Sequence, residues 1–214
     1  MNATITSTAH YVPEKVLTNS DLEKLVDTSD EWIKSRVGIN QRHVVSDGEA
    51  SSDMSTKVAH SLLEKRGISA ANIDVIIIGT VTPDHPTPST AAIVQNNINA
   101  ENAWAFDLSA ACSGFLYALE TGAKFIESGQ YKTIMVIGVD TMTSILDFED
   151  RETCIIFGDG AGGVILEASK SNTGILGSVL KTDGSGAESL NVLAGGSKYP
   201  ASPITIKNRQ HYIC

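Results

Sequence analysis

The sequence contains no hydrophobic run that approaches the roughly 20 residues of a membrane-spanning helix. Its start, Met1 to Thr6, has neither the basic residues nor the apolar core of a signal peptide. With 42% hydrophobic and 19% charged residues, the chain does not have the composition of a disordered protein. We therefore expect a globular protein that works in the cytoplasm without a membrane partner.

Cysteine and basic residues are also scarce. The three cysteines, Cys112, Cys154 and Cys214, are widely spaced and form no Cys-x-x-Cys pair, so they indicate neither a disulfide framework nor a zinc site. We expect free thiols and no metal. Sixteen basic against 25 acidic residues give a net charge of −9, which disfavours nucleic acid as a partner. An anionic ligand would need a local basic patch.

Short apolar runs predict the core of the fold. Residues 74–79, 104–108 and 133–138 are typical of strands in a parallel sheet, and the segments 89–99 and 112–128 between them have the length of helices. The order strand, helix, strand, helix, strand predicts a doubly wound α/β unit. In the second helix, an apolar stripe should face the sheet, formed by Cys112, Phe115, Leu116, Leu119, Ala123 and Ile126.

The flanking segments give further predictions. Capping-box patterns at Thr18 and Thr28 predict two short helices, and a longer helix should run from Ser52 to Arg66 and end at Gly67. Residues 163–167 and 175–182 are interpreted as strands. The glycine-rich segment 157–163 lacks the ending of a phosphate-binding loop and is interpreted as a structural turn, while 183–203 is rich in Gly, Ser and Pro and predicts a loop.

Cys112 has the sequence context of a nucleophile. It follows a predicted strand and begins a predicted helix, where unpaired amides favour the thiolate form. Small neighbours, Ala110, Ala111, Ser113 and Gly114, permit a sharp turn that resembles a nucleophile elbow. A cysteine taken alone is more often a small buried apolar residue, and we interpret Cys154 and Cys214 as inert thiols.

The segment Asp107–Phe115 closely resembles the active-site motif of β-ketoacyl-acyl-carrier-protein synthase III, a condensing enzyme of the thiolase superfamily. The resemblance also covers Asp30–Ile39, Pro83–Thr90 and Phe157–Gly162, and it runs from near the start of the chain to its end. It implies a thiolase-like layered α/β fold with a mixed, mainly parallel sheet. Cys112 would then be the catalytic cysteine.

The resemblance also implies a binding site for coenzyme A. The equivalents of Trp32 and Arg151 enclose the adenine in the family, and those of Thr28 and Arg36 lie beside the nucleotide. Elementary chemistry agrees, because Trp32 and Arg36 lie four residues apart and can share one helix face, as an aromatic surface beside a phosphate-pairing cation. Without the motif, such a pair would more often be a packed ring and a solvated charge.

Three further residues are assigned to an acyl pocket by the same resemblance. Met142 and Phe157 would lie beside the acyl group, and Thr87 would lie on the loop that reaches the partner subunit in the family homodimer. Many relatives have an aromatic residue in place of Thr87, so the smaller side chain would admit longer or branched acyl groups. The alternative is a neutral loop substitution.

The resemblance covers only the first half of a two-halved fold. We expect residues 1–182 to form an N-terminal thiolase-like half and 183–214 to be a linker and the start of the second half. The family's catalytic histidine and asparagine belong to that second half, and none of the five histidines of this chain matches the former. We therefore favour a fragment over a naturally short protein, and expect that it does not catalyse condensation alone.

The implied reaction initiates type II fatty-acid synthesis. Cys112 takes an acyl group from an acyl-CoA and malonyl-acyl-carrier-protein then condenses with it, with coenzyme A thioesters as substrates and no further cofactor. Three alternatives remain: a quinolone- or polyketide-type condensing enzyme, a non-catalytic subunit, and a cysteine hydrolase. The combination of Trp32, Arg36 and Arg151 argues against the hydrolase.

Overall fold

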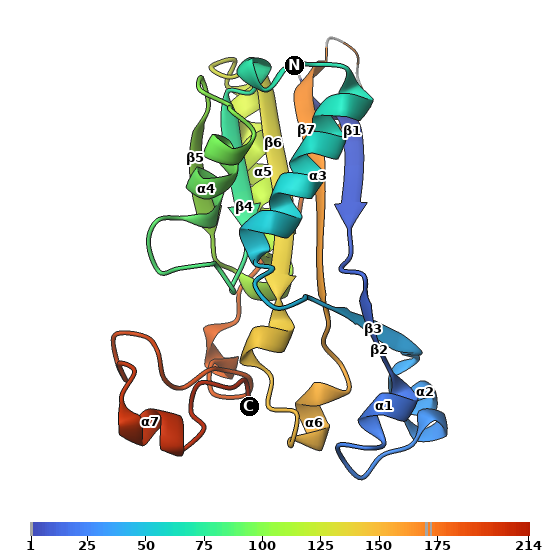
Figure 1. The fold of residues 1–214 in the computed structure, drawn as a ribbon. Helices are drawn as coiled ribbons and strands as arrows, with labels where there is room; N and C mark the ends of the chain where they lie inside the picture. Colours follow the sequence, from blue (N-terminus) through green and yellow to red (C-terminus); the bar gives the residue numbers. More distant parts are fainter. Residues whose placement is uncertain (1, 170, 172) are drawn as a thin grey trace. The chain divides into compact units, whose positions relative to one another are not determined.

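A computed structural model describes residues 2–169, 171 and 173–214. The chain forms two compact units (Figure 1). The first unit contains residues 1–13, 45–140 and 160–180, and the second contains residues 14–44, 141–159 and 181–214.

The first unit is built on a five-stranded sheet with the order β1-β7-β6-β4-β5. Its strands are β1 (Asn2–Tyr11), β4 (Val75–Gly79), β5 (Trp104–Leu108), β6 (Thr133–Thr141) and β7 (Asp159–Ser169). The central strand β4 pairs in parallel with β5 and with β6, whereas β1 pairs antiparallel with β7. The sheet is therefore mixed, as predicted.

Helices cover both faces of this sheet, as Figure 1 shows. Helices α3 (Ser51–Arg66) and α4 (Thr90–Asn97) pack on one face and α5 (Gly114–Glu127) on the other. Successive residues of β4 alternate between the two cores: Ile76 and Ile78 belong to the core that α3 and α4 help to form, while Val75 and Ile77 belong to the core on the α5 side. All four are completely buried. This explains why β4 has an uninterrupted apolar sequence.

Most of the elements predicted in this unit are confirmed. The strands 74–79, 104–108 and 133–138 correspond to β4, β5 and β6, and the helix 52–66 corresponds to α3, which ends at Gly67 with φ +70°. A short 3-10 turn, Ala70–Asn72 (η1), follows α3. The segment 89–99 forms α4, and α5 begins at Gly114 instead of residue 112.

Three predictions for the sheet were wrong or incomplete. The glycine-rich segment 157–163 is not a turn throughout, because β7 begins at Asp159 and extends through the glycines. Glycine suits this strand at Gly163, where a Cβ would stand 2.8 Å from the carbonyl oxygen of Val136. The segment 175–182 is not a strand; Ile175 meets the sheet through a hydrogen bond from its amide to the Ala3 carbonyl (2.8 Å) and packs against the core on that face. Strand β1 was not predicted.

The second unit is smaller and has its own core. It contains an antiparallel pair of strands, β2 (Lys15–Thr18) and β3 (Gln41–Val44), and the short helices α1 (Asn19–Leu22), α2 (Asp30–Val37), α6 (Arg151–Cys154) and α7 (Pro203–Lys207). Two 3-10 turns, Met142–Ile145 (η3) and Gly184–Gly186 (η4), complete it. Its apolar core is formed by Leu22, Ile33, Cys154 and Ile155. The predicted loop 183–203 is confirmed apart from η4 and the start of α7.

Two features are absent from the described residues. No helix among them has the length and hydrophobicity needed to cross a bilayer. No group of three or more His, Cys, Asp or Glu side chains in the described part is arranged to hold a metal ion.

Candidate active site

The turn that carries Cys112 links β5 to α5 in the first unit. A 3-10 turn, Ala111–Ser113 (η2), follows Ala110 and runs directly into α5. Ala111 has φ +45°, a left-handed conformation that is uncommon for a residue with a Cβ and that clusters at functional sites. The following residue, Cys112, is exposed. The backbone thus presents the thiol at the surface, immediately before the helix.

This arrangement corrects the predicted apolar stripe. Cys112 and Leu116 do not face the sheet: both are exposed, Leu116 at 55%. Ala123 and Ile126 are buried, and Phe115 and Leu119 pack against the same core, as predicted. Small residues, which include Gly114 and Ala118, occupy the other buried positions of α5. These small residues allow α5 to approach the sheet closely, and the positions that the prediction missed are therefore buried.

Asp107 links β5 to the neighbouring helix. Its carboxylate accepts hydrogen bonds from the amides of Thr90 (2.7 Å) and Ala91 (2.8 Å), at the start of α4. A carboxylate at this place satisfies unpaired amides and interacts favourably with the helix dipole. From the sequence, Asp107 was expected only as part of the cysteine motif. The sequence offered one indication of this capping role, namely an acidic residue near the end of a predicted strand.

The first half of the loop between β4 and α4 is anchored at two points. One carboxylate oxygen of Asp140 accepts hydrogen bonds from the amides of Val81 (2.8 Å) and Thr82 (3.2 Å) and from the hydroxyl of Thr80 (3.0 Å). Asp84 accepts two hydrogen bonds from Ser52 at the start of α3. Thr87 lies exposed beyond these anchors.

A cavity of about 530 Å³ lies beside this loop. It is lined by Thr80, Val81, Pro83, His85, Pro86, Ser89, Ala105, Phe106, Asp107 and Ser109. Neither Cys112 nor Thr87 is among the lining residues.

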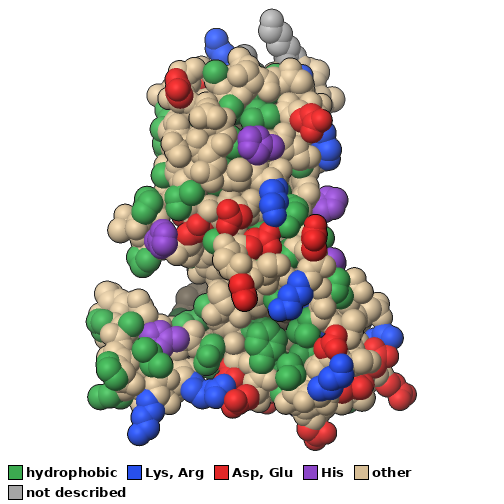
Figure 2. All heavy atoms as spheres, in the orientation of Figure 1, with side chains coloured by type: hydrophobic (Ala, Val, Ile, Leu, Met, Phe, Trp, Pro, Cys, Tyr) green, Lys and Arg blue, Asp and Glu red, His purple; other side chains and the backbone are tan. Residues whose placement is uncertain are grey.

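The second unit brings together Trp32 and Arg151, which are far apart in the sequence. The guanidinium carbon of Arg151 lies 4.4 Å from the centroid of the Trp32 ring, within the range of a cation–π contact. A cavity of about 420 Å³ adjoins them, lined by Trp32, Val37, Arg151, Glu152, Ile155 and Ile156. Figure 2 shows hydrophobic side chains gathered over α6 and toward α2, with acidic and basic side chains beside them.

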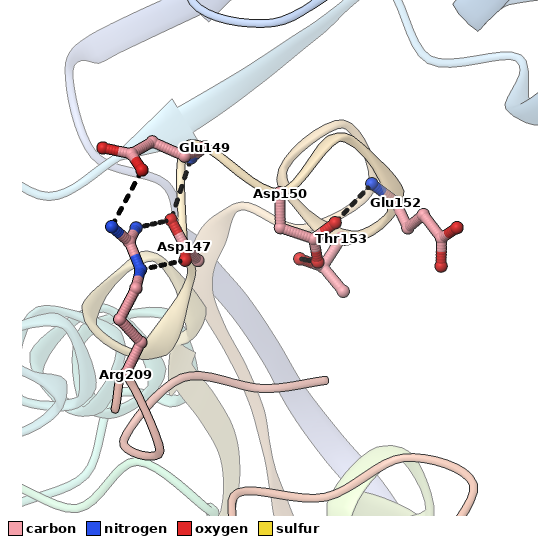
Figure 3. A network of polar contacts seen from close by, with 6 residues as sticks. All are labelled: Asp147, Glu149, Asp150, Glu152, Thr153 and Arg209. Atoms are coloured by element: carbon pink, nitrogen blue, oxygen red, sulfur yellow. Dashed lines mark hydrogen bonds and ion pairs between the residues drawn. The ribbon is translucent and has the colours of Figure 1, made fainter. Parts of the chain in front are cut away.

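Capping residues position both members of this pair. The predicted cap Thr28 is corrected to Ser29, whose hydroxyl accepts a hydrogen bond from the Trp32 amide (3.1 Å). Asp150 caps α6 by accepting from the Glu152 amide (2.9 Å) and the Thr153 hydroxyl (2.7 Å), as drawn in Figure 3. The predicted cap at Thr18 is confirmed, with a reciprocal capping box to Asp21.

The other predicted site residues of the second unit differ in burial. The hydroxyl oxygen of Thr28 is buried and has no hydrogen-bond partner. Arg36 is exposed on α2, and no carboxylate of the described residues forms an ion pair with Arg36 or Arg151. Met142 begins η3 and Phe157 lies between α6 and β7; both are half-buried. An unpartnered hydroxyl and two available cations are suited to a polar, anionic ligand.

The loop before α6 is held by a residue from the last part of the chain. Figure 3 shows Arg209 donating to both oxygens of Asp147 and to Glu149. The Arg209 guanidinium holds the pKa of Asp147 below its ordinary value.

Burial raises the pKa of the Cys154 thiol, which is consistent with the prediction that this cysteine is unreactive.

Comparison with known proteins identifies the family of the chain. The sequence model described as 3-oxoacyl-[acyl-carrier-protein] synthase III matches residues 106–184. Over its whole length, the chain is 57% identical to a β-ketoacyl-[acyl-carrier-protein] synthase III of Chlorobaculum tepidum and 54% identical to one of Chlorobium chlorochromatii. The chain belongs to the β-ketoacyl-[acyl-carrier-protein] synthase III family. It spans 66% of the length of each of these two synthase III relatives.

Solved structures of synthase III proteins have the same fold. The crystal structure from Thermus thermophilus matches 94% of this chain and 61% of its own, with 37% identity and a TM-score of 0.86. The structure from Aquifex aeolicus matches 79% of this chain and 55% of its own, with 46% identity and a TM-score of 0.77. A priming β-ketosynthase of a polyketide pathway also matches, with 28% identity and a TM-score of 0.88. The predicted thiolase-like α/β fold is thus confirmed.

Proposed function

We propose that this synthase III chain provides the acyl-accepting part of the initiating condensing enzyme of type II fatty-acid synthesis. The observation that carries the proposal is the exposed Cys112 on a strained turn between β5 and α5. The full reaction uses an acyl-CoA, such as acetyl-CoA, and malonyl-acyl-carrier-protein. It gives β-ketoacyl-acyl-carrier-protein, coenzyme A and CO₂.

In the first step, the Cys112 thiolate attacks the thioester carbonyl of the acyl-CoA. The carbonyl oxygen becomes an oxyanion that backbone amides can stabilise, and the coenzyme A thiolate leaves when the tetrahedral intermediate collapses. In the second step, decarboxylation of the malonyl group releases CO₂ and a carbanion. The carbanion attacks the acyl group on Cys112, whose thiolate leaves. These steps require a thiol nucleophile and oxyanion donors, and no metal or resident cofactor.

The second unit would bind the nucleotide of coenzyme A. The exposed Arg151 side chain can swing away from Trp32 and close again over the adenine, so that the base lies between guanidinium and indole. The buried hydroxyl of Thr28 has no partner and is available to the nucleotide, and Arg36 can pair with a phosphate. The cavity beside Trp32 and Arg151 supports this assignment.

The acyl pocket and the assembly are also proposed. Met142 and Phe157 would contact the acyl group, and Thr87 would affect its permitted length. A homodimer is supported by β5, which lies at the edge of the sheet in the described chain and carries the 43% exposed Trp104. We further propose a cytoplasmic location, and a division of the chain at residue 182, as the family resemblance implies.

Acyl transfer can be tested with radiolabelled acetyl-CoA and mass spectrometry of the intact protein. We expect a stable acyl adduct on the wild type and none on Cys112→Ala. Cys214→Ala is the matched control, because Cys214 is also an exposed thiol, and Cys154→Ala controls for a buried one. Both controls should be labelled like the wild type. Equal labelling of Cys112→Ala would refute the assignment.

The same experiment addresses the alternatives. A non-catalytic subunit would give no adduct although coenzyme A binds, and a cysteine hydrolase would release free acid from the adduct at a rate that matches its formation. A polyketide-type enzyme would be acylated in the same way. It would differ from a fatty-acid enzyme in the acyl group that it prefers, which competition between acetyl-CoA and longer acyl-CoAs measures.

A further inference from the structure

Arg42 is a buried cation in the second unit. It lies on β3 with only 4% of its surface exposed, and no carboxylate of the described residues forms an ion pair with it. Burial lowers the pKa of its guanidinium. Removing a charge from water costs several kcal/mol unless hydrogen bonds compensate. The contacts that compensate this charge therefore show what Arg42 does in the fold.

One side of the Arg42 guanidinium holds the end of α6. Its Nε and Nη2 atoms both donate to the carbonyl oxygen of Ile155, the Nε bond measuring 3.0 Å. Ile155 directly follows α6, which has only four residues. A helix this short cannot be stable alone, and a cation at its last carbonyls is favourable for both hydrogen bonding and the helix dipole. Arg42 thus fixes the helix that begins with Arg151.

The other side of the guanidinium holds α2. The Nη1 atom donates to the side-chain oxygen of Asn19, which is itself 1% exposed. The side-chain nitrogen of Asn19 donates to the carboxylate of Asp30 (2.8 Å) and to the backbone carbonyl of Ile39 (2.9 Å). Asp30 is the first residue of α2, and Ile39 follows its C-terminal Gly38. Asn19 therefore ties both ends of the helix that carries Trp32 to the same guanidinium.

We propose that Arg42 is a positioning residue, which fixes the α2 and α6 backbones so that Trp32 and Arg151 face each other across the ligand. The inference rests on the proposed coenzyme A site and deepens it. Arg42 does not touch the cavity, whose lining residues do not include it. Lysine cannot replace it, because a single ammonium lacks the planar fork that reaches two acceptors in different directions.

The test uses Trp104→Phe, so that Trp32 is the single tryptophan of the chain. Arg42→Met and Arg42→Lys are compared with Arg151→Ala and with Val58→Ala, a core substitution in the first unit that lowers stability without touching the second. The readouts are acrylamide quenching of Trp32 without ligand, the dissociation constant for coenzyme A by calorimetry, and the thermal midpoint.

We expect both Arg42 variants to increase the quenching of Trp32 toward that of Arg151→Ala. We also expect them to raise the dissociation constant about tenfold, comparable to the loss of one charged hydrogen bond. Val58→Ala should change only the thermal midpoint. Arg42 variants that lose stability but keep wild-type quenching and affinity would overturn the proposal, because Arg42 would then be merely structural.

Two further outcomes are also decisive. If neither Arg42 variant folds, Asn19→Ala serves instead, because it removes the link to α2 and leaves the bond to Ile155; unchanged quenching in Asn19→Ala overturns the proposal. If the wild type does not bind coenzyme A, the proposed nucleotide site fails. The quenching of Trp32 still decides whether Arg42 positions it, so the two failures are distinguishable.

Discussion

Gly79 and Gly114 bring strand β4 into direct backbone contact with the start of α5. A Cβ on Gly79 would stand 2.8 Å from the carbonyl carbon of Gly114, closer than real Cβ atoms approach. A Cβ on Gly114 would meet nothing nearer than 3.6 Å, an ordinary contact. Glycine is therefore required at position 79 and not at position 114, although both residues lie at the same contact.

We expect Gly79→Ala to destabilise the protein by about 2–3 kcal/mol, because the backbone of α5 must move. Gly114→Ala should change stability by less than about 1 kcal/mol, because alanine fits and favours a helix. Urea unfolding measures both, with Gly177→Ala as the control, since a Cβ there meets nothing within 4 Å. Equal losses at Gly79 and Gly114 would contradict this geometry.

The sequence predicted the central part of the fold well because its strands are buried on both faces. Strands β4 and β6 have apolar runs that need no knowledge of their neighbours. Strand β1 was missed because its sequence is mainly polar and only its pairing with β7 defines it. The segment 175–182 has apolar residues like a strand, but it forms no ladder in the structure.

Only the part of the candidate site whose residues are neighbours in the sequence could be predicted from the residues alone. Cys112 and its small neighbours form one contiguous motif, whereas a site shared by Trp32 and Arg151 was expected from the family resemblance alone, and their direct contact was not predicted. The roles of Asp107 and Arg42 depend on elements that the chain brings together from far apart. The place of Arg42 within a short strand gave no indication of its partners, and the place of Asp107 at the end of β5 did not reveal which helix its carboxylate caps.

Asp107, which belongs to the cysteine motif, is also expected to stabilise the fold by capping α4. Asp107→Ala removes two charge-assisted hydrogen bonds from the start of α4 and should cost about 2 kcal/mol. The control is Ser89→Ala, which removes a single neutral cap bond to the Ala92 amide (3.2 Å) and should cost about 1 kcal/mol. Urea unfolding of both variants measures the difference. If Ser89→Ala proves the more harmful, the capping role of Asp107 is wrong.

The three thiols should react at very different rates with iodoacetamide. Cys112 and Cys214 are exposed, whereas Cys154 is fully buried and burial raises its pKa, which lowers its thiolate fraction at any neutral pH. We expect labelling of two cysteines in the native protein and of the third only after unfolding in urea, as peptide mass spectrometry can determine. Rapid native labelling of Cys154 would show that the core around it opens readily.

The ion pair between Arg209 and Asp147 should contribute a pH-dependent part of stability. Arg209 holds the pKa of Asp147 below its ordinary value, so the folded state binds fewer protons than the unfolded state in the acidic range. The stabilisation is therefore complete above about pH 4, the unfolded pKa, and is lost as the pH falls through the lower folded pKa.

Asp147→Asn should consequently cost up to about 1 kcal/mol at pH 7, a limit set by the 46% exposure of the Arg209 side chain and its screening by solvent. Below pH 4 the difference in the free energy of unfolding between Asp147→Asn and the wild type should shrink progressively. Urea unfolding across the acidic range can measure it. Glu149→Gln is the matched control, because its side chain is 79% exposed and bonds the same guanidinium through one oxygen. Its effect should be smaller at pH 7. A difference for Asp147→Asn that stays constant down to the lowest pH would mean that the charge of Asp147 is not what stabilises this loop.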